Sequence, residues 1–187
     1  MYGRRPDSLH LIMKSTKKLT IAAITVALGT VIMSAGVMLE VVDLTMSAVA
    51  SLLVVLIYIE MGSPYTWIVW IATSLTTAIM FFGSAVWVEY LLVFGSYPLI
   101  KAYIERLPRL LWLPIKLLYV NAVVLVLLFV VEGLLGIPVF EEGVGKWWKV
   151  ALVVLANVAF VAYDLFITVM VRVYIFKWRK HFARFFK

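Results

Sequence analysis

Apolar residues of this 187-residue chain are grouped into long runs, which are separated by charged residues or by glycine and proline. Each run is close to the ~20 mainly apolar residues that a helix needs to cross a lipid bilayer. A lipid-facing β-barrel would alternate polar and apolar residues, and these runs do not alternate. The pattern therefore predicts an all-α polytopic membrane protein, a six-transmembrane-helix bundle. The predicted helices cover residues 19–39, 44–61, 64–83, 86–104, 110–136 and 148–176.

The composition agrees with a membrane location. Hydrophobic residues make up 65% of the chain and charged residues 14%, whereas soluble domains are about half apolar and about a quarter charged. Little sequence remains for a soluble part, so we expect a single membrane domain over residues 1–187. The formal net charge of +7 does not indicate nucleic-acid binding, because the basic residues lie at the ends of the apolar runs, where they orient a protein in a bilayer.

The distribution of these basic residues predicts the topology. Five precede the first run, four lie between the fourth and fifth runs and six end the chain, which is 15 of the 17. The positive-inside rule then places both termini in the cytoplasm, with the chain in the plasma or inner membrane. The basic and aromatic tail, residues 177–187, is expected on the same side. It either lies along the anionic leaflet or acts only as a basic stop signal.

Asp164 is a carboxylate in an otherwise apolar run. A charge at mid-bilayer costs roughly 2.5–3.5 kcal/mol on insertion scales, so such residues face the interior of a bundle or a wet cavity. Asn157, Asp164, Thr168 and Arg172 follow one another at spacings of 7, 4 and 4, which places them on one helix face. The pattern predicts a polar stripe that points into the bundle.

Partners for Asp164 are sought at the same depth on other helices. Lys116 and Asn121 lie within the first turns of the fifth helix, and Lys101 lies near the end of the fourth. We expect Asp164 to pair with Lys116 or Lys101 and to accept a hydrogen bond from Asn121. Two interpretations stay open. The group is either a structural ion pair that sets the register of the helices, or an intramembrane proton or ligand site.

Polar residues near the outer ends of the helices are candidates for ligand binding. Asp43, Glu89, Tyr90 and Trp148 are expected to surround an outward pocket, with Asn157 deeper in it. The alternative is a solvated acidic edge with an aromatic belt at the headgroup level. The stretch FGSYP at 94–98 interrupts the fourth helix, and a kink is expected because Pro98 removes one backbone hydrogen bond.

Small residues line one side of the first helix. Ala23 and Ala27 are four residues apart, and Ala22, Gly29 and Gly36 recur every seven. Small residues allow close helix approach in lipid. This side is therefore either a docking face for another membrane protein or a packing surface inside the bundle.

Motifs of enzymes are not found. The two histidines are terminal, and HExxH, G-x-S-x-G, P-loop and GxGxxG patterns are missing from the sequence. We therefore expect no catalytic residue, no metal site, no cofactor and no enzymatic activity. ATP-driven transport would need a motor from a separate protein.

The order of helices resembles a known family. The opening helix contains LTIAAITVALG, DLTMSAVASLLVVLIYIEMGSPYTWIVWIATSL follows it, and the last helix contains LANVAFVAYDLFITVMVRVYI. This pattern is similar to the membrane-embedded substrate-binding subunits, or S components, of energy-coupling factor transporters. The resemblance implies that Ala23 and Ala27 dock a transmembrane coupling subunit that works with ABC-type ATPases. It also implies that the outer halves of the last three helices, including Asn157, bind an unidentified small-molecule solute.

The loop after the first helix is shorter here than in that family. A second resemblance, in size and helix number, is to MreD-like proteins, which are small scaffolds of the cell-wall elongation machinery. The sequence thus predicts an S-component-like solute-binding subunit. The alternatives are a non-transporting membrane scaffold and a proton-coupled carrier centred on Asp164. Lipid is an expected partner in each case.

Overall fold

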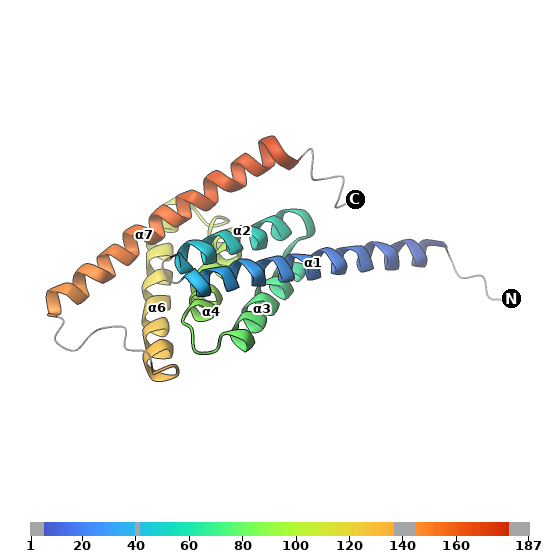
Figure 1. The fold of residues 1–187 in the computed structure, drawn as a ribbon. Helices are drawn as coiled ribbons and strands as arrows, with labels where there is room; N and C mark the ends of the chain where they lie inside the picture. Colours follow the sequence, from blue (N-terminus) through green and yellow to red (C-terminus); the bar gives the residue numbers. More distant parts are fainter. Residues whose placement is uncertain (1–5, 40–41, 137–144, 180–187) are drawn as a thin grey trace.

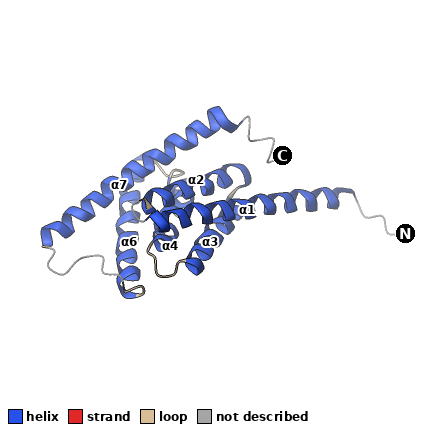
Figure 2. Ribbon diagram, viewed as in Figure 1, coloured by secondary structure: helices blue, strands red, loops and turns tan. Residues whose placement is uncertain are grey.

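The computed structural model describes residues 6–39, 42–136 and 145–179 (Figure 1). Within these ranges the regular secondary structure is entirely helical (Figure 2). Residues 180–187, which form most of the predicted tail, lie outside the described residues. The helices are α1 (Pro6–Leu39), α2 (Asp43–Met61), α3 (Ser63–Met80), α4 (Val86–Glu89), α5 (Tyr97–Ile104), α6 (Trp112–Gly133) and α7 (Lys146–Val173), with π-helical turns η1 (Tyr90–Phe94) and η3 (Tyr174–Trp178) and a 3₁₀ turn η2 (Arg109–Leu111).

Four helical segments are long and apolar enough to cross a membrane, by length and composition. They correspond to four of the six predicted spans. The predicted span at 64–83 forms α3, whose serines, threonines and aromatic residues lower its hydropathy. The predicted span at 86–104 is divided into α4, η1 and α5. The four segments are Thr16–Leu39, Asp43–Met61, Arg109–Gly133 and Val150–Trp178.

The first helix is longer than predicted. The apolar run begins at residue 19, but α1 begins at Pro6. Proline suits the first position of a helix because its missing N–H would have no partner there. No glycine or proline follows until Gly29, so the helical hydrogen bonds continue through the polar residues. In Figure 1 the N-terminal turns of α1 project beyond the other helices.

The predicted interruption at FGSYP is present, as a π-helical turn followed by a two-residue turn. Pro98 has no N–H to donate to the carbonyl of Phe94, which lies four residues earlier. The hydroxyl of Tyr163, on α7, donates to that carbonyl at 3.0 Å. The carbonyl of Leu92 accepts from the hydroxyl of Tyr119 at 2.9 Å. Side chains from neighbouring helices thus satisfy the backbone groups that the break releases.

Helices α1, α2 and α3 pack closely through small residues. Ala22 is fully buried. A Cβ at Gly29 would lie 3.1 Å from the Thr73 methyl group, and one at Gly36 would lie 3.0 Å from the Met46 Cβ. These are close approaches that larger residues would prevent. The stripe of Ala22, Gly29 and Gly36 therefore packs inside the bundle.

Helices α6 and α7 expose large apolar surfaces. Leu125 and Phe129 on α6 are 69% and 79% exposed, and Leu155 on α7 is 61% exposed. Figure 1 shows α7 passing obliquely across α6. Contiguous apolar surface of this extent indicates contact with lipid or with another protein. Together with the four apolar segments, it is compatible with a membrane protein.

Candidate functional site

A buried ion cluster joins α5, α6 and α7. The Lys116 ammonium donates to both carboxylate oxygens of Asp164, at 2.9 and 2.8 Å. The Lys101 ammonium forms a second ion pair with Asp164 and also donates to the Thr168 hydroxyl at 2.8 Å. The side chains of Lys101 and Lys116 are only 7% and 9% exposed. Asp164 therefore pairs with both lysines, whereas the sequence analysis predicted a pair with only one of them.

Glu105 completes this cluster and was not predicted. Its carboxylate lies 3.0 Å from the Lys101 ammonium and 3.3 Å from that of Lys116. Two lysines and two carboxylates balance to a formal charge of zero. The sequence did contain a signal for Glu105. It lies four residues after Lys101, and oppositely charged residues at this spacing are neighbours on a helix surface.

Tyr97 and Thr168 also form hydrogen bonds with Asp164. The Tyr97 hydroxyl donates to Oδ1 of Asp164. The Thr168 hydroxyl donates to the Asp164 backbone carbonyl at 2.8 Å. A buried carboxylate is tolerated when its oxygens are paired and hydrogen-bonded. Asp164 meets this condition with partners from two other helices.

Asn121 does not donate to Asp164, which corrects the prediction. Its amide donates to the Asn157 side-chain oxygen at 3.0 Å, and the Asn157 amide donates to the Asn121 side-chain oxygen at 3.1 Å. Each amide also donates to the backbone carbonyl four residues before it. Asn157 is seven residues before Asp164, or about 10 Å along the helix, so it pairs with Asn121 in a separate layer.

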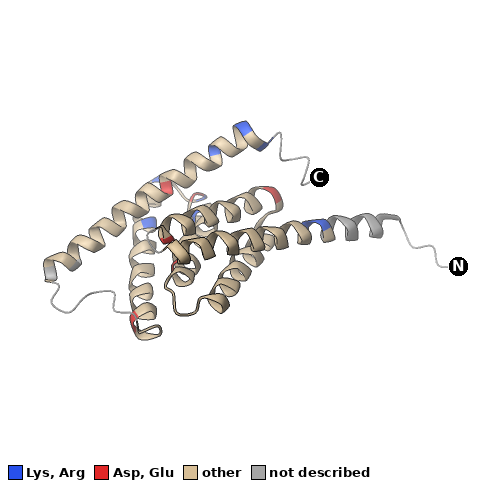
Figure 3. Ribbon diagram, viewed as in Figure 1, with Lys and Arg blue, Asp and Glu red and all other residues tan. Residues whose placement is uncertain are grey.

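Arg172 was predicted to extend the polar stripe of α7 toward the bundle interior. Its side chain is exposed instead. The described ion pairs of the cluster do not include it. Figure 3 shows mainly uncharged residues along the described helices, with charged positions near helix ends, part-way along α1 and midway along α7.

A cavity of about 200 Å³ lies beside the ion cluster, between α2, α5 and α7, and we call it the inner cavity after the side that the sequence predicts to be cytoplasmic. Lys101 and Glu105 line it, so two of the four charges of the cluster face an open space. Its other walls are mainly apolar. Its lining residues are Val55, Tyr58, Ile59, Pro98, Lys101, Ala102, Glu105, Ile167 and Val171.

A second cavity of about 240 Å³ lies between η1, α6 and α7, and we call it the outer cavity after the side that the sequence predicts to face outward. Glu89 is the only charged residue among those described that line it. One of its carboxylate oxygens, Oε2, is buried and has no hydrogen-bond partner among the described residues. Because buried carboxylates are costly without a partner, this oxygen needs one. The lining residues are Leu44, Glu89, Val93, Phe94, Val120, Val124, Leu127, Ala156, Ala159, Phe160 and Tyr163.

The predicted ligand-binding residues are only partly brought together by the fold. Glu89 lines the outer cavity, and Asp43 is close enough to act electrostatically on it. Tyr90 is instead buried in a core cluster with Met33. Trp148 is 67% exposed near the start of α7. Asn157 is held by Asn121, so it does not line the cavity.

An aromatic layer separates the outer cavity from the ion cluster. The rings of Tyr97 and Phe160 meet edge to face, with centroids 4.6 Å apart. Phe94 and Tyr163 meet in the same way at 5.0 Å. Phe94, Phe160 and Tyr163 line the outer cavity, whereas Tyr97 donates to Asp164 on the other side. We call these four residues the aromatic layer.

The two small-residue rows of α1 have different environments. Ala23 and Ala27 are exposed, whereas Ala22 is buried. Exposed apolar residues surround the alanine pair, including Ile24 at 63% and Val31 at 65%. No described segment covers the face formed by Ala23 and Ala27.

Comparisons with known proteins identify no relative. No family model matches the chain, and neither the curated proteins nor the solved structures contain a significant match.

Proposed function

We propose that this chain is an S-component-like solute-binding subunit of a membrane transporter. It crosses the membrane six times with both termini in the cytoplasm, and it works with a separate coupling subunit and ABC-type ATPases. The solute enters the outer cavity from outside and leaves after the bundle reorients against its partner. α3 and the divided segment α4–η1–α5 supply the other two spans: α3 is less apolar than the four long segments, and α4–η1–α5 is interrupted.

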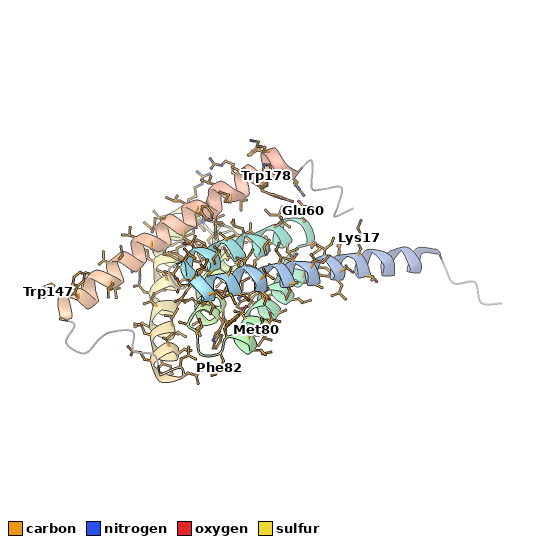
Figure 4. All side chains as sticks on the ribbon, viewed as in Figure 1. Lys17, Glu60, Met80, Phe82, Trp147 and Trp178 are labelled. Atoms are coloured by element: carbon orange, nitrogen blue, oxygen red, sulfur yellow. The ribbon has the colours of Figure 1, made fainter. Side chains whose placement is uncertain are left out.

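Contacts between helix ends support this topology. The Lys18 ammonium lies 5.7 Å from the centre of the Tyr65 ring, so the base of the α1 span adjoins the start of α3. The Arg179 Nε lies 3.1 Å from the Glu60 carboxylate, which joins the end of η3 to the end of α2. In Figure 4, Lys17, Glu60 and Trp178 lie toward one end of the molecule and Trp147 lies at the other. Six spans would place the first three on the cytoplasmic side.

The observation that carries the proposal is the outer cavity. It lies where the resemblance places the solute, between the outer halves of the last three spans. A filled bundle without such a cavity would favour a scaffold. The breaks around it are also suited to function, since broken helices at membrane depth are tolerated where they are buried in protein or line a cavity.

The exposed pair Ala23 and Ala27 supports the docking part of the proposal. In lipid, helix association depends on close packing of small residues. The adjacent row of α1, with Ala22, already packs inside the bundle. The exposed row, with Ala23 and Ala27, is therefore available to a partner. The same face would also serve a scaffold, and the partner's identity decides between the two.

The test is affinity purification from native membranes followed by mass spectrometry. We expect the wild-type protein to recover a pair of ABC-type ATPases with a membrane coupling subunit. Ala23→Leu/Ala27→Leu should lose them, because the added side chains prevent close approach. Ala151→Leu, at an exposed alanine of α7, is the matched control and should retain them. Recovery of only cell-wall synthesis proteins would contradict the transporter and favour the scaffold.

A second candidate is a proton-coupled carrier, which the inner cavity favours. Lys101 and Glu105 line this cavity and both belong to the Asp164 cluster. Water in the cavity would therefore reach groups that can exchange protons with Asp164. Proton movement into proteoliposomes that is lost in Asp164→Asn and kept in Arg172→Gln would support this function. Equal proton movement in both variants would contradict it.

A further inference from the structure

We propose that the outer cavity binds a small organic cation, namely a protonated amine carried on an apolar body about the size of a substituted benzene ring. The inference rests on the proposed solute-binding function and narrows it to one class of solute. It follows from the charge of the cavity, its volume and the chemistry of its walls.

The charge of the cavity favours a cation. Oε2 of Glu89 is buried without a hydrogen-bond partner among the described residues. Asp43 adds a second negative charge nearby. None of the described lining residues is a lysine or arginine. A carboxylate shielded from water stays ionised only when a cation or a set of donors compensates it. An ammonium group on the solute supplies both the charge and the hydrogen-bond donors.

The volume limits the size of the solute. A cavity of roughly 150 Å³ holds a benzene molecule, and this cavity measures about 240 Å³. Sites for drug-sized ligands measure roughly 300–1,000 Å³. One ring with a short arm therefore fits within the cavity.

The walls match an apolar body. Apart from Glu89, the lining residues are aliphatic or aromatic, and the Tyr163 hydroxyl is already held by Ser51 at 2.7 Å and by the Phe94 carbonyl. Phe94 and Phe160 present rings that can contact an aromatic solute or the cation itself. The body of the solute thus lies against α6, α7 and η1, and its amine reaches Glu89.

A metal ion is a poor match for the same site. Calcium takes about six to eight oxygen ligands. The described residues contain no group of three or more histidine, cysteine, aspartate or glutamate side chains placed to hold a metal. A carboxylate in a hydrocarbon-lined cavity suits a cation that brings its own apolar surface.

The experiment measures binding to the purified full-length protein in lipid nanodiscs by isothermal titration calorimetry. The probes are phenethylamine, which is protonated at neutral pH, and 2-phenylethanol, its uncharged analogue of nearly the same shape. We expect phenethylamine to bind at least about tenfold more tightly, because hydrogen bonds to a charged group are stronger than neutral ones. Glu89→Gln should reduce the affinity for phenethylamine to that for 2-phenylethanol.

Two variants complete the test. Glu132→Gln changes an exposed glutamate of α6 that does not line the cavity, and it should leave both affinities unchanged. Ala156→Leu fills the cavity without changing its charge and should weaken the binding of both probes. The proposal is overturned if phenethylamine does not bind, if both probes bind wild-type protein equally, or if either Glu89→Gln or Ala156→Leu binds phenethylamine as wild type does.

The outcomes separate this inference from the proposed function. Recovery of the ATPases without amine binding would support the proposed transporter function and contradict the proposal that its solute is an organic cation. Amine binding without any ATPase would keep the solute class and reject the motor-driven subunit.

Discussion

Lys116 of α6 donates to both carboxylate oxygens of Asp164 on α7, at 2.9 and 2.8 Å, although the two residues are 48 positions apart in the chain. This contact joins two helices whose other described surfaces are largely exposed to the surroundings. With Lys101 and Glu105, it forms a neutral group of four charges. The group links α5, α6 and α7, and it borders the inner cavity.

Removing one member of this group should be costly. Asp164→Asn leaves two lysines against one carboxylate, and breaking a buried pair from one side costs about 3–5 kcal/mol. Asp164→Asn/Lys116→Met removes one charge of each sign, so we expect it to recover much of the lost stability. The measurement is the midpoint of thermal unfolding of purified protein in detergent. Arg172→Gln, an exposed site on the same helix, is the control and should change little. A double variant no more stable than Asp164→Asn would show that the charges are not coupled.

The pair Asn121 and Asn157 should contribute a smaller interaction. Interhelical hydrogen bonds in membrane proteins average about 0.6 kcal/mol in double-mutant cycles, with a maximum of about 1.7. We expect Asn121→Leu and Asn157→Leu to show a coupling energy within that range. A cycle built from Asn121→Leu and Asp164→Asn should show weaker coupling, because these residues occupy different layers. The reverse order of couplings would contradict the observed pairing.

The contribution of Tyr163 to stability should depend on Pro98. The Tyr163 hydroxyl shares its one hydrogen between the Ser51 hydroxyl at 2.7 Å and the Phe94 carbonyl at 3.0 Å, and the helical partner of that carbonyl would be the missing N–H of Pro98. Tyr163→Phe should therefore destabilise the protein by about 1–3 kcal/mol, the usual cost of leaving a buried polar group unsatisfied. In a Pro98→Ala background the same change should cost less, because residue 98 then supplies an N–H. Equal costs in the two backgrounds, measured by thermal unfolding, would refute this explanation.

Gly95 should not tolerate a side chain. A Cβ at this position would lie 2.4 Å from Cδ1 of Trp70 and 2.9 Å from its Nε1. Trp70 donates to the Leu91 carbonyl at 3.2 Å, so its displacement would also release a backbone group of η1. We expect Gly95→Ala to destabilise by about 1–3 kcal/mol and to change the near-ultraviolet circular dichroism of tryptophan. Gly83→Ala, where a Cβ meets no atom within 4 Å, is the matched control.

The number of spans is testable because the chain contains no cysteine. In the six-span topology, Gly83→Cys in the α3–α4 connection faces outside and Ser63→Cys at the start of α3 faces the cytoplasm. A membrane-impermeant maleimide should label Gly83→Cys in intact cells. It should label Ser63→Cys only after the membrane is opened. Absence of labelling of Gly83→Cys from outside would reduce the spans to the four apolar segments.

The candidate site was only partly readable from the sequence. Asp164 and Lys116 were identifiable because charges within apolar runs need partners. Glu105 could have been found from its spacing to Lys101. The contribution of Tyr97 could not, because a tyrosine near a helix break is equally suited to the headgroup region. Tyr90 and Trp148 were predicted to line a pocket because they are aromatic residues near the outer ends of predicted helices. The rotation of the helices instead turns Tyr90 into the core and Trp148 toward the surroundings.

The sequence by itself determined the helical class, the apolar segments, the break around Pro98 and the need to neutralise Asp164. These properties follow from local rules, since hydrocarbon runs, missing N–H groups and buried charges have the same consequences in any fold. Tertiary structure decided that Asn121 binds Asn157, that Ala23 and Ala27 stay exposed while Ala22 is buried, and that Glu89 lines a cavity. Each of these depends on how helices rotate and cross, and the packing of all neighbouring side chains sets those angles together.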